Sequence, residues 1–176
     1  MGGFDGVVDL TSLKKMPLLD FNKLYHHIIP LDNFELYWRF NNKNYDLFCD
    51  VDLKKLKPLD KLASNFLWDI ALKMNPDIEI PFKKNHFKII KNKIIDYNHK
   101  DDLKTWLYEC GVPSNQEVIV SWNSTISMIL PWKILVEYFD SFYYTSSDDL
   151  TVFDKNLDWT ILFAHYDEIY FGTNRL

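Results

Sequence analysis

The sequence is poor in several residue types, and each shortage narrows what the protein can be. Of its 176 residues only 5 are glycine, 7 proline and 2 cysteine, which argues against a linker-rich, fibrous or disulfide-stapled chain. No uninterrupted apolar run approaches the roughly 18 residues that a membrane-spanning helix needs. The N-terminus lacks the basic, apolar and small-residue regions of a secretory signal. We therefore expect a cytoplasmic protein with no membrane partner.

Sequence motifs for catalysis, metals and cofactors are also missing. Cys49 and Cys110 form no C-x-x-C pair, the histidines match no zinc-ligand spacing, and no glycine-rich nucleotide loop or G-x-S-x-G elbow occurs. We therefore predict a protein that is not an enzyme, with no metal and no cofactor. The two cysteines are interpreted as small apolar residues, and a disulfide between them is left open.

Aromatic and apolar side chains are abundant. Phe, Trp and Tyr make up 16% of the chain, and hydrophobic residues as a whole make up 47%. At this length, such a composition is typical of a globular protein with a true core rather than a disordered chain. We expect residues 1–176 to form a single globular domain, with residues 1–10 as a loose end.

Hydrophobic periodicity predicts helices early in the chain and paired strands late. The stretches with helical spacing are 17–30, 57–76, 101–111, which Asp101 would cap, and 131–142. Strands are expected at 34–40, 117–122 and 150–153, followed by a hairpin of 159–166 and 168–172. The stretch 81–99 is compatible with either. This order predicts an α+β fold: an antiparallel sheet with several helices packed on it and a C-terminal β-hairpin.

Charge is unevenly distributed along the chain. The net charge is −2 over residues 1–80, +5 over residues 81–100 and −8 over residues 101–176. An acidic half repels phosphate backbones and attracts basic proteins, so nucleic acid is not an expected partner. A nucleic-acid binder remains an alternative because of the lysines within residues 83–93, which are Lys83, Lys84, Lys88, Lys91 and Lys93.

The carboxylates of the C-terminal third have no ligand or catalytic spacing. Asp148 and Asp149 lack the pattern of a calcium loop, so a turn or helix cap is favoured there. His165 could face Glu168 across the expected hairpin, which would raise the pKa of the histidine and suit acid–base chemistry. A small hydrolase using His165 with Asp167 or Glu168 is thus a second alternative, although no nucleophile accompanies these residues.

A family resemblance adds to these observations. The segments W-K-x-x-x-E-Y-F-D-S-F from Trp132, S-D-D at 147–149 and W-T-I-L-F-A-H-Y-D-E-I-Y-F-G up to Gly172 resemble small bacterial immunity proteins, including those of contact-dependent growth-inhibition systems. Residues 131–172 carry most of the resemblance, and residues 29–40 carry a weaker part. It implies a cytoplasmic, non-enzymatic antitoxin whose partner is a cognate toxin, often a nuclease domain with a basic groove.

The acidic C-terminal half and the resemblance together predict a toxin inhibitor. We expect an immunity protein that neutralises a cognate toxin, most simply a nuclease domain, through an acidic surface in a protein–protein interaction. The expected interface charges are Asp148, Asp149, Asp154, Asp158, Asp167 and Glu168. Tyr143 and Tyr144 are expected as aromatic anchors.

Overall fold

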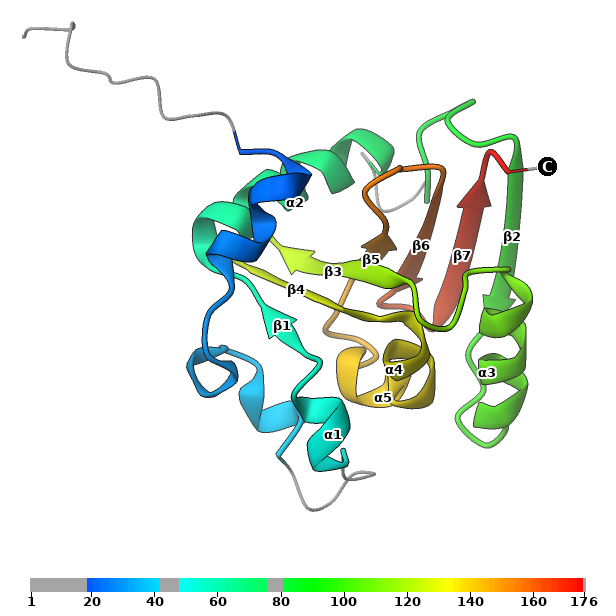
Figure 1. Ribbon diagram of the computed structural model, residues 1–176. Coiled ribbons are helices and arrows are strands. Elements are labelled where there is room, and N and C mark those ends of the chain that lie inside the picture. The colour runs from blue at the N-terminus through cyan, green and yellow to red at the C-terminus, as the bar shows by residue number, and fades with distance from the viewer. Residues whose placement is uncertain (1–18, 42–47, 76–80, 176) are drawn as a thin grey trace, which may run out of the picture.

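One seven-stranded antiparallel sheet organises the molecule in the computed structural model, which describes residues 19–41, 48–75 and 81–175 (Figure 1). The strand order is β1-β4-β3-β5-β6-β7-β2. The strands are β1 Lys57–Pro58, β2 Ile89–Ile94, β3 Glu117–Asn123, β4 Ile126–Pro131, β5 Leu150–Phe153, β6 Trp159–Ala164 and β7 Glu168–Thr173. The α+β class and the C-terminal hairpin, β6–β7, are confirmed. The loose end expected at residues 1–10 lies outside the described residues.

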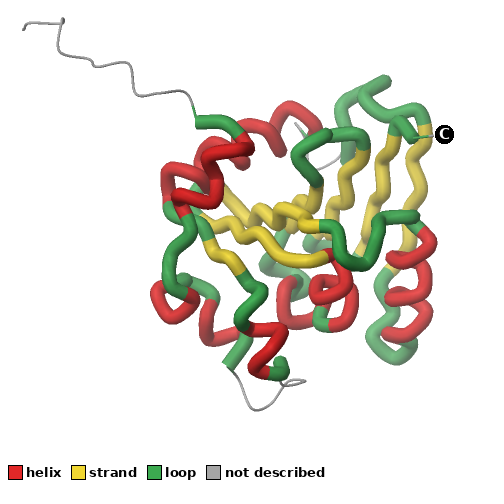
Figure 2. Tube along the Cα trace, in the orientation of Figure 1, coloured by secondary structure: helices red, strands yellow, loops and turns green. Residues whose placement is uncertain are grey.

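Short helices surround the sheet (Figure 2). The described residues include the 3-10 helices η2 Phe21–His27, η3 Leu31–Asn33 and η4 Tyr37–Arg39. The α-helices are α1 Asp50–Leu53, α2 Lys61–Met74, α3 Lys100–Glu109, α4 Trp132–Glu137 and α5 Phe139–Phe142. In Figure 1, α2 lies on one side of β3 and β4, whereas α4 and α5 lie on the other.

Each face of the sheet has its own core, because successive strand residues point to opposite faces. Val118 and Val120 of β3 pack on the face with α4 and α5, and Ile119 between them packs on the face with α2. The inner strands β5 and β6 are buried along their whole length. Their sequences, LTVF and WTILFA, are therefore nearly continuous apolar runs, as expected for strands covered on both faces.

The strand predicted at residues 34–40 is wrong. These residues form turns and η4, in which Tyr37 N bonds Phe34 O at 2.9 Å and Phe40 N bonds Tyr37 O at 3.0 Å. Phe34 and Phe40 point into the core as the alternation suggested, but Trp38 is exposed and Arg39 is buried. The backbone satisfies its hydrogen bonds locally, and Arg39 turns inward to a partner far away in the sequence.

Several expected helices are present, but their type or their ends differ from the prediction. The helix expected at 17–30 is the 3-10 helix η2, capped by Asp20 and ending at His27; residues 17 and 18 lie outside the described residues. Of the helix expected at 57–76, the part Lys61–Met74 is confirmed as α2, which Asp60 caps through Ala63 N at 2.9 Å, whereas Lys57 and Pro58 form strand β1 instead. Helix α3 begins after His99, so Asp101 lies in its first turn rather than at its cap. Strand β4 was not anticipated.

Candidate functional site

Asp148, expected as an interface charge, is buried, with 9% of its surface exposed. Its two carboxylate oxygens accept hydrogen bonds from the guanidinium of Arg39, at 2.5 and 3.1 Å, and one also accepts from Tyr144 N at 2.8 Å. Such a two-pronged pair compensates the charge of a guanidinium that is itself buried. Asp148 therefore fastens the 34–40 segment to the turn before β5 and is not available to a partner.

Asp154 is the second expected interface charge that the structure buries, with 3% exposure. It closes the β5–β6 turn by accepting bonds from the backbone N–H groups of Asn156 and Leu157 at 3.0 and 3.1 Å. Its other oxygen accepts from Gln116 at 2.6 Å and Arg175 at 3.1 Å. The carboxylate is consumed by internal donors, so its role is to hold this turn.

Tyr143 is also corrected, because its side chain is only 1% exposed. The hydroxyl donates to the carbonyl oxygen of Ala164 at 2.6 Å, which ties α5 to the end of β6. Burial, followed by the charge of Asp167, raises the pKa of Tyr143 to about 12. Tyr144 is partly buried, and its ring lies 4.2 Å from the guanidinium carbon of Arg39.

The remaining expected charges divide between two ends of the sheet. Asp149, Asp167 and Glu168 lie where β5 begins and where β6 turns into β7. Asp158 lies at the opposite end of β6, which is about 20 Å away for a six-residue strand. The single acidic rim that the sequence suggested therefore does not exist, and only the first three charges can act together.

The β6–β7 turn brings together acids and tyrosines on a surface that the sequence did not reveal. Asp167 adopts a left-handed conformation, φ 64°, and closes the turn through a bond from its N–H to Ala164 O at 3.0 Å. The carbonyl of Asp167 also accepts from Ile95 N at 2.8 Å. Its carboxylate accepts a hydrogen bond from the hydroxyl of Tyr97 at 3.1 Å. Among residues other than glycine, Asn and Asp are the ones most often found in the left-handed conformation, which is consistent with an aspartate at this position.

Glu168 is held in a similar way on the neighbouring strand. Its carboxylate accepts bonds from the side-chain amide of Asn92 on β2 and from the hydroxyl of Tyr170 at 2.6 Å. Tyr166 lies alongside, with its hydroxyl 3.3 Å from that of Tyr170. We call the partly or fully exposed residues of this region the turn surface: Ile94, Tyr97, Asp149, His165, Tyr166, Asp167 and Glu168.

Neutral donors hold the carboxylates of Asp167 and Glu168. Burial is the main cause that raises the pKa of Tyr97 and of Tyr170, and the neighbouring carboxylates raise it further. Both phenols therefore stay protonated and donate at neutral pH. Within the described residues, neither Asp167 nor Glu168 forms an ion pair. Their negative charges are fixed in place without being cancelled.

The hydrolase alternative requires His165 to contact Asp167 or Glu168, but the structure pairs His165 with Asp149 instead. Its Nδ1 lies 3.0 Å from Asp149 Oδ1, and the same oxygen accepts a bond from His165 N at 2.9 Å. No hydroxyl or thiol bonds the other ring nitrogen in the described part of the chain. A groove of about 910 Å³ occurs elsewhere in the molecule, and His165 does not line it. These contacts give His165 a structural role, because they connect the β6–β7 turn to Asp149 at the beginning of β5.

The lysines proposed for nucleic acid spread along an edge of the sheet. Lys83, Lys84 and Lys88 are exposed in the loop before β2, and Lys91 and Lys93 lie on β2 itself. Lysines on an edge strand also oppose unwanted strand pairing between molecules. No exposed aromatic platform interleaves with them, since their strand neighbours are Ile89, Ile90 and Ile94.

The two cysteines are free thiols. Cys49 is exposed and Cys110 is partly buried, and burial raises the pKa of Cys110 to about 12. In the part of the chain that the structure describes, no helix is long and apolar enough to cross a membrane, and no group of three or more metal-ligating side chains occurs.

Comparisons with known proteins give no relative from which a role could be carried over. No family model, no curated protein and no solved structure matches the chain.

Proposed function

We propose that this chain is a cytoplasmic immunity protein that binds and neutralises a cognate bacterial toxin domain, with the turn surface as its contact. One observation carries the proposal: Tyr97, in the turn after β2, holds the carboxylate of Asp167, and Asn92 on β2 and Tyr170 on β7 hold that of Glu168, while no cation among the described residues pairs with either acid. The resemblance of residues 131–172 to immunity proteins points in the same direction.

The composition of the turn surface suits a protein partner. Tyr97 and Tyr166 are 38% and 43% exposed, and Ile94 is 72% exposed. Tyrosine is enriched in the energetically important centres of interfaces, where a rigid ring loses little entropy on binding. Carboxylates around such residues orient the partner and accelerate its approach. A small-molecule site would need a concave pocket instead.

A basic nuclease domain is the partner that this charge pattern favours. A nuclease carries a positive groove for its phosphate substrate, and fixed carboxylates can occupy that groove in place of phosphates. Because these carboxylates keep their orientation in the free protein, little ordering cost arises on binding. The immunity protein would thus inhibit the toxin by occupying its substrate groove, which requires no catalytic residue in this chain.

The test is a triple variant, Asp149→Asn, Asp167→Asn and Glu168→Gln, which keeps the shapes of the side chains. The partner to be tested is the C-terminal domain of any large secreted protein whose gene is found directly upstream. We expect the association rate constant to fall at least about tenfold at low salt, and its salt dependence to flatten. Stopped-flow mixing at two salt concentrations measures both, and a growth assay under toxin expression measures protection.

A second triple variant controls for net charge. Asp69→Asn on α2, Glu109→Gln at the far end of α3 and Asp158→Asn remove three exposed carboxylates away from the turn surface. The control should associate within about twofold of the unmodified protein, because contacts near the interface dominate steering. Equal rates for the turn-surface variant and the unmodified protein would show that another face binds. If the domain neither binds nor harms growth, the immunity role itself is wrong.

A further inference from the structure

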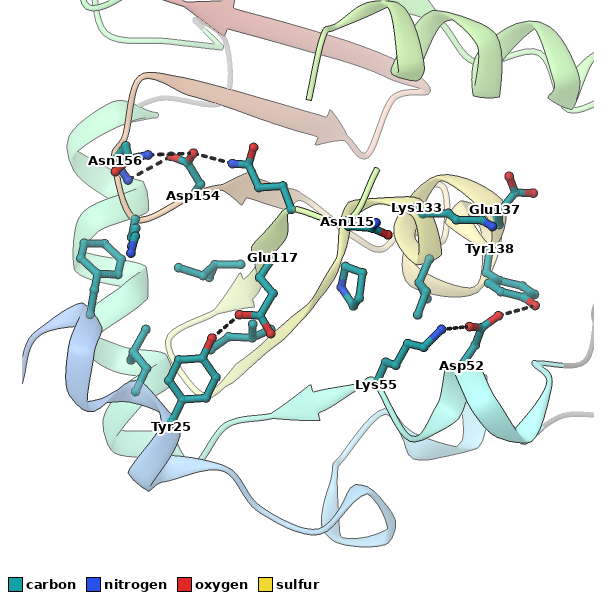
Figure 3. A pocket seen from close by; sticks show the side chains of 18 of the residues that line it. Tyr25, Asp52, Lys55, Asn115, Glu117, Lys133, Glu137, Tyr138, Asp154 and Asn156 are labelled. Carbon is teal, nitrogen blue, oxygen red and sulfur yellow. Dashed lines mark hydrogen bonds and ion pairs between the residues drawn. The ribbon is translucent and has the colours of Figure 1, made fainter. Parts of the chain in front are cut away.

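A groove of about 910 Å³ lies between the N-terminal 3-10 helix η2, helix α1 and the strands β3 and β4 (Figure 3). Its floor is apolar and contains Leu24, Ile119, Ile129 and Ile134, each of them buried. Polar side chains stand on the walls. Figure 3 shows Tyr25 with Glu117 on one side and Lys55 with Asp52 on another. A volume of this size and an apolar floor with a polar rim are typical of sites for small organic molecules.

Each carboxylate that lines the groove already has a cation. Asp52 pairs with Lys55 at 2.8 Å and Asp154 with Arg175 at 3.1 Å. The two remaining pairs are Glu117 with Lys57, and Glu137 with Lys104 at 3.6 Å. The negative charge of each acid in the groove is thus compensated by a neighbouring lysine or arginine.

Hydroxyl donors take up much of the acceptor capacity that these carboxylates have left. Tyr25 donates to Glu117, Tyr108 donates to Glu137 at 2.9 Å, and Tyr138 lies 3.4 Å from an oxygen of Asp52. Bonding to Glu117 is the main cause that raises the pKa of Tyr25 to about 12. The phenol therefore remains a neutral donor at physiological pH. The acids consequently offer little to a cationic ligand.

Two lysines of the groove are left over. In the described part of the chain, the ammonium groups of Lys133 on α4 and Lys155 in the β5–β6 turn have no hydrogen-bond or ion-pair partner. The side-chain amide of Asn115, also in the groove, likewise has none. When each acid is counted together with the cation that it pairs with, Lys133 and Lys155 remain as the groove's unpaired charges. Its uncommitted groups are predominantly donors.

From this we infer that the groove binds an amphipathic organic anion, with the acid group at one of these two lysines, Lys133 or Lys155, and an apolar body on the floor of Leu24, Ile119 and Ile129. A charge-assisted hydrogen bond from the ammonium group selects for the acid. The apolar floor selects for a ring or a short chain rather than for inorganic phosphate. The inference is independent of the turn surface and of toxin binding.

Two dyes of nearly equal shape test the inference on the full chain. The anionic probe is 8-anilinonaphthalene-1-sulfonate, and the neutral probe is N-phenyl-1-naphthylamine, which lacks the sulfonate. Both fluoresce in apolar surroundings. We expect saturable binding of the anion to the folded protein at one site, and at least about fivefold weaker binding of the neutral dye. Amide shifts in a two-dimensional NMR spectrum should map to Leu24, Ile119 and Ile129.

A variant with Lys133→Gln and Lys155→Gln should weaken the anion about five- to tenfold and leave the neutral dye unchanged. The matched control is Lys91→Gln with Lys93→Gln, which removes the same charge from β2 and should bind the anion within about twofold. The inference is overturned if the two variants behave alike, if both dyes bind equally, or if the shifts map elsewhere. Thermal unfolding of each variant confirms that the folded protein is compared.

Discussion

The turn surface and the groove contain similar numbers of carboxylates, yet they have opposite electrostatic character. At the turn surface, Asp167 and Glu168 accept bonds from tyrosine hydroxyls and an asparagine amide, so their charges persist. In the groove, lysines and an arginine cancel each acid, and Lys133 and Lys155 remain in excess. The character of a surface thus depends on which donors hold its acids, rather than on how many acids it has.

Rigidity also distinguishes the two regions. The turn surface stands at the end of the β6–β7 hairpin, which pairs over its whole length and is flanked by β2. The groove joins elements that are far apart in the sequence, namely η2, α1, β3, β4 and the β5–β6 turn. A preformed hairpin end suits recognition of a large, rigid partner, whereas a groove between separate elements can adjust to a small ligand.

The largest expected effect concerns the pair beneath the turn surface. Asp148→Asn leaves the guanidinium of Arg39 buried without a counter-charge, so we expect the free energy of unfolding to fall by about 3–5 kcal/mol. Urea denaturation followed by circular dichroism measures this. The exposed Asp158→Asn should change it by less than about 0.5 kcal/mol. A loss below about 1 kcal/mol for Asp148→Asn would mean that Arg39 is compensated by other groups.

A double variant measures the interaction between Arg39 and Asp148 separately from the contacts that each residue makes with its other neighbours. Arg39→Met combined with Asp148→Asn removes both charges, so it should be less destabilised than the sum of the two single variants. Trp38 and Tyr144 flank the guanidinium at 5.4 and 4.2 Å, and they can cover the methionine side chain. Additive losses would indicate that the two residues stabilise the fold independently of each other.

The C-terminal fold could be predicted from the sequence because each element has a local cause. Strands β5, β6 and β7 are short apolar runs separated by turns, and α4 begins directly after Pro131. The 34–40 segment could not be predicted, because the alternation of its aromatic residues is typical of a strand. Its conformation instead depends on Asp148, which is 109 residues away from Arg39.

The candidate site was only partly predictable for a related reason. A charge count treats all acids of residues 101–176 alike, whereas the structure pairs five of them with lysine or arginine: Glu117, Glu137, Asp140, Asp148 and Asp154. These pairs join distant parts of the chain, so no local pattern marks them. Tyr97 was missed because it lies in a stretch whose periodicity suited either a helix or a strand.

A smaller loss of stability is expected from Gly172, on strand β7 of the hairpin that carries the turn surface. A methyl group at Gly172 on β7 would come within 2.3 Å of Cδ2 of Phe87, which is buried over this residue. Gly172→Ala should therefore lower the free energy of unfolding by about 1–3 kcal/mol, as measured in urea. Phe87→Leu in the same chain should recover part of the loss. An unchanged stability would show that Phe87 can move aside freely.

The smallest expected effect is a pH dependence that belongs to the groove. Burial alone would raise the pKa of Glu117, but the hydrogen bonds from Lys57 and Tyr25 outweigh it and lower that pKa. A carboxyl with a lowered folded-state pKa stabilises the protein above its unfolded value, near 4.5. This stabilisation is lost as the pH falls through the folded-state pKa. Since the side chain is 38% exposed, the contribution should stay below about 1 kcal/mol.

Glu117→Gln should therefore be slightly less stable than the unmodified protein at pH 7, and the difference should be smaller at about pH 3, where the carboxyl of the unfolded chain is protonated. Urea denaturation at the two pH values measures the change. Lys57→Gln removes the cation from the other side, so it should reproduce most of the loss at pH 7. If Glu117→Gln shows the same difference in stability at both pH values, the loss comes from packing and not from the charge of Glu117. Lys57 would then not compensate that charge, and the electrostatic contrast between the groove and the turn surface would be weaker than the ion pairs imply.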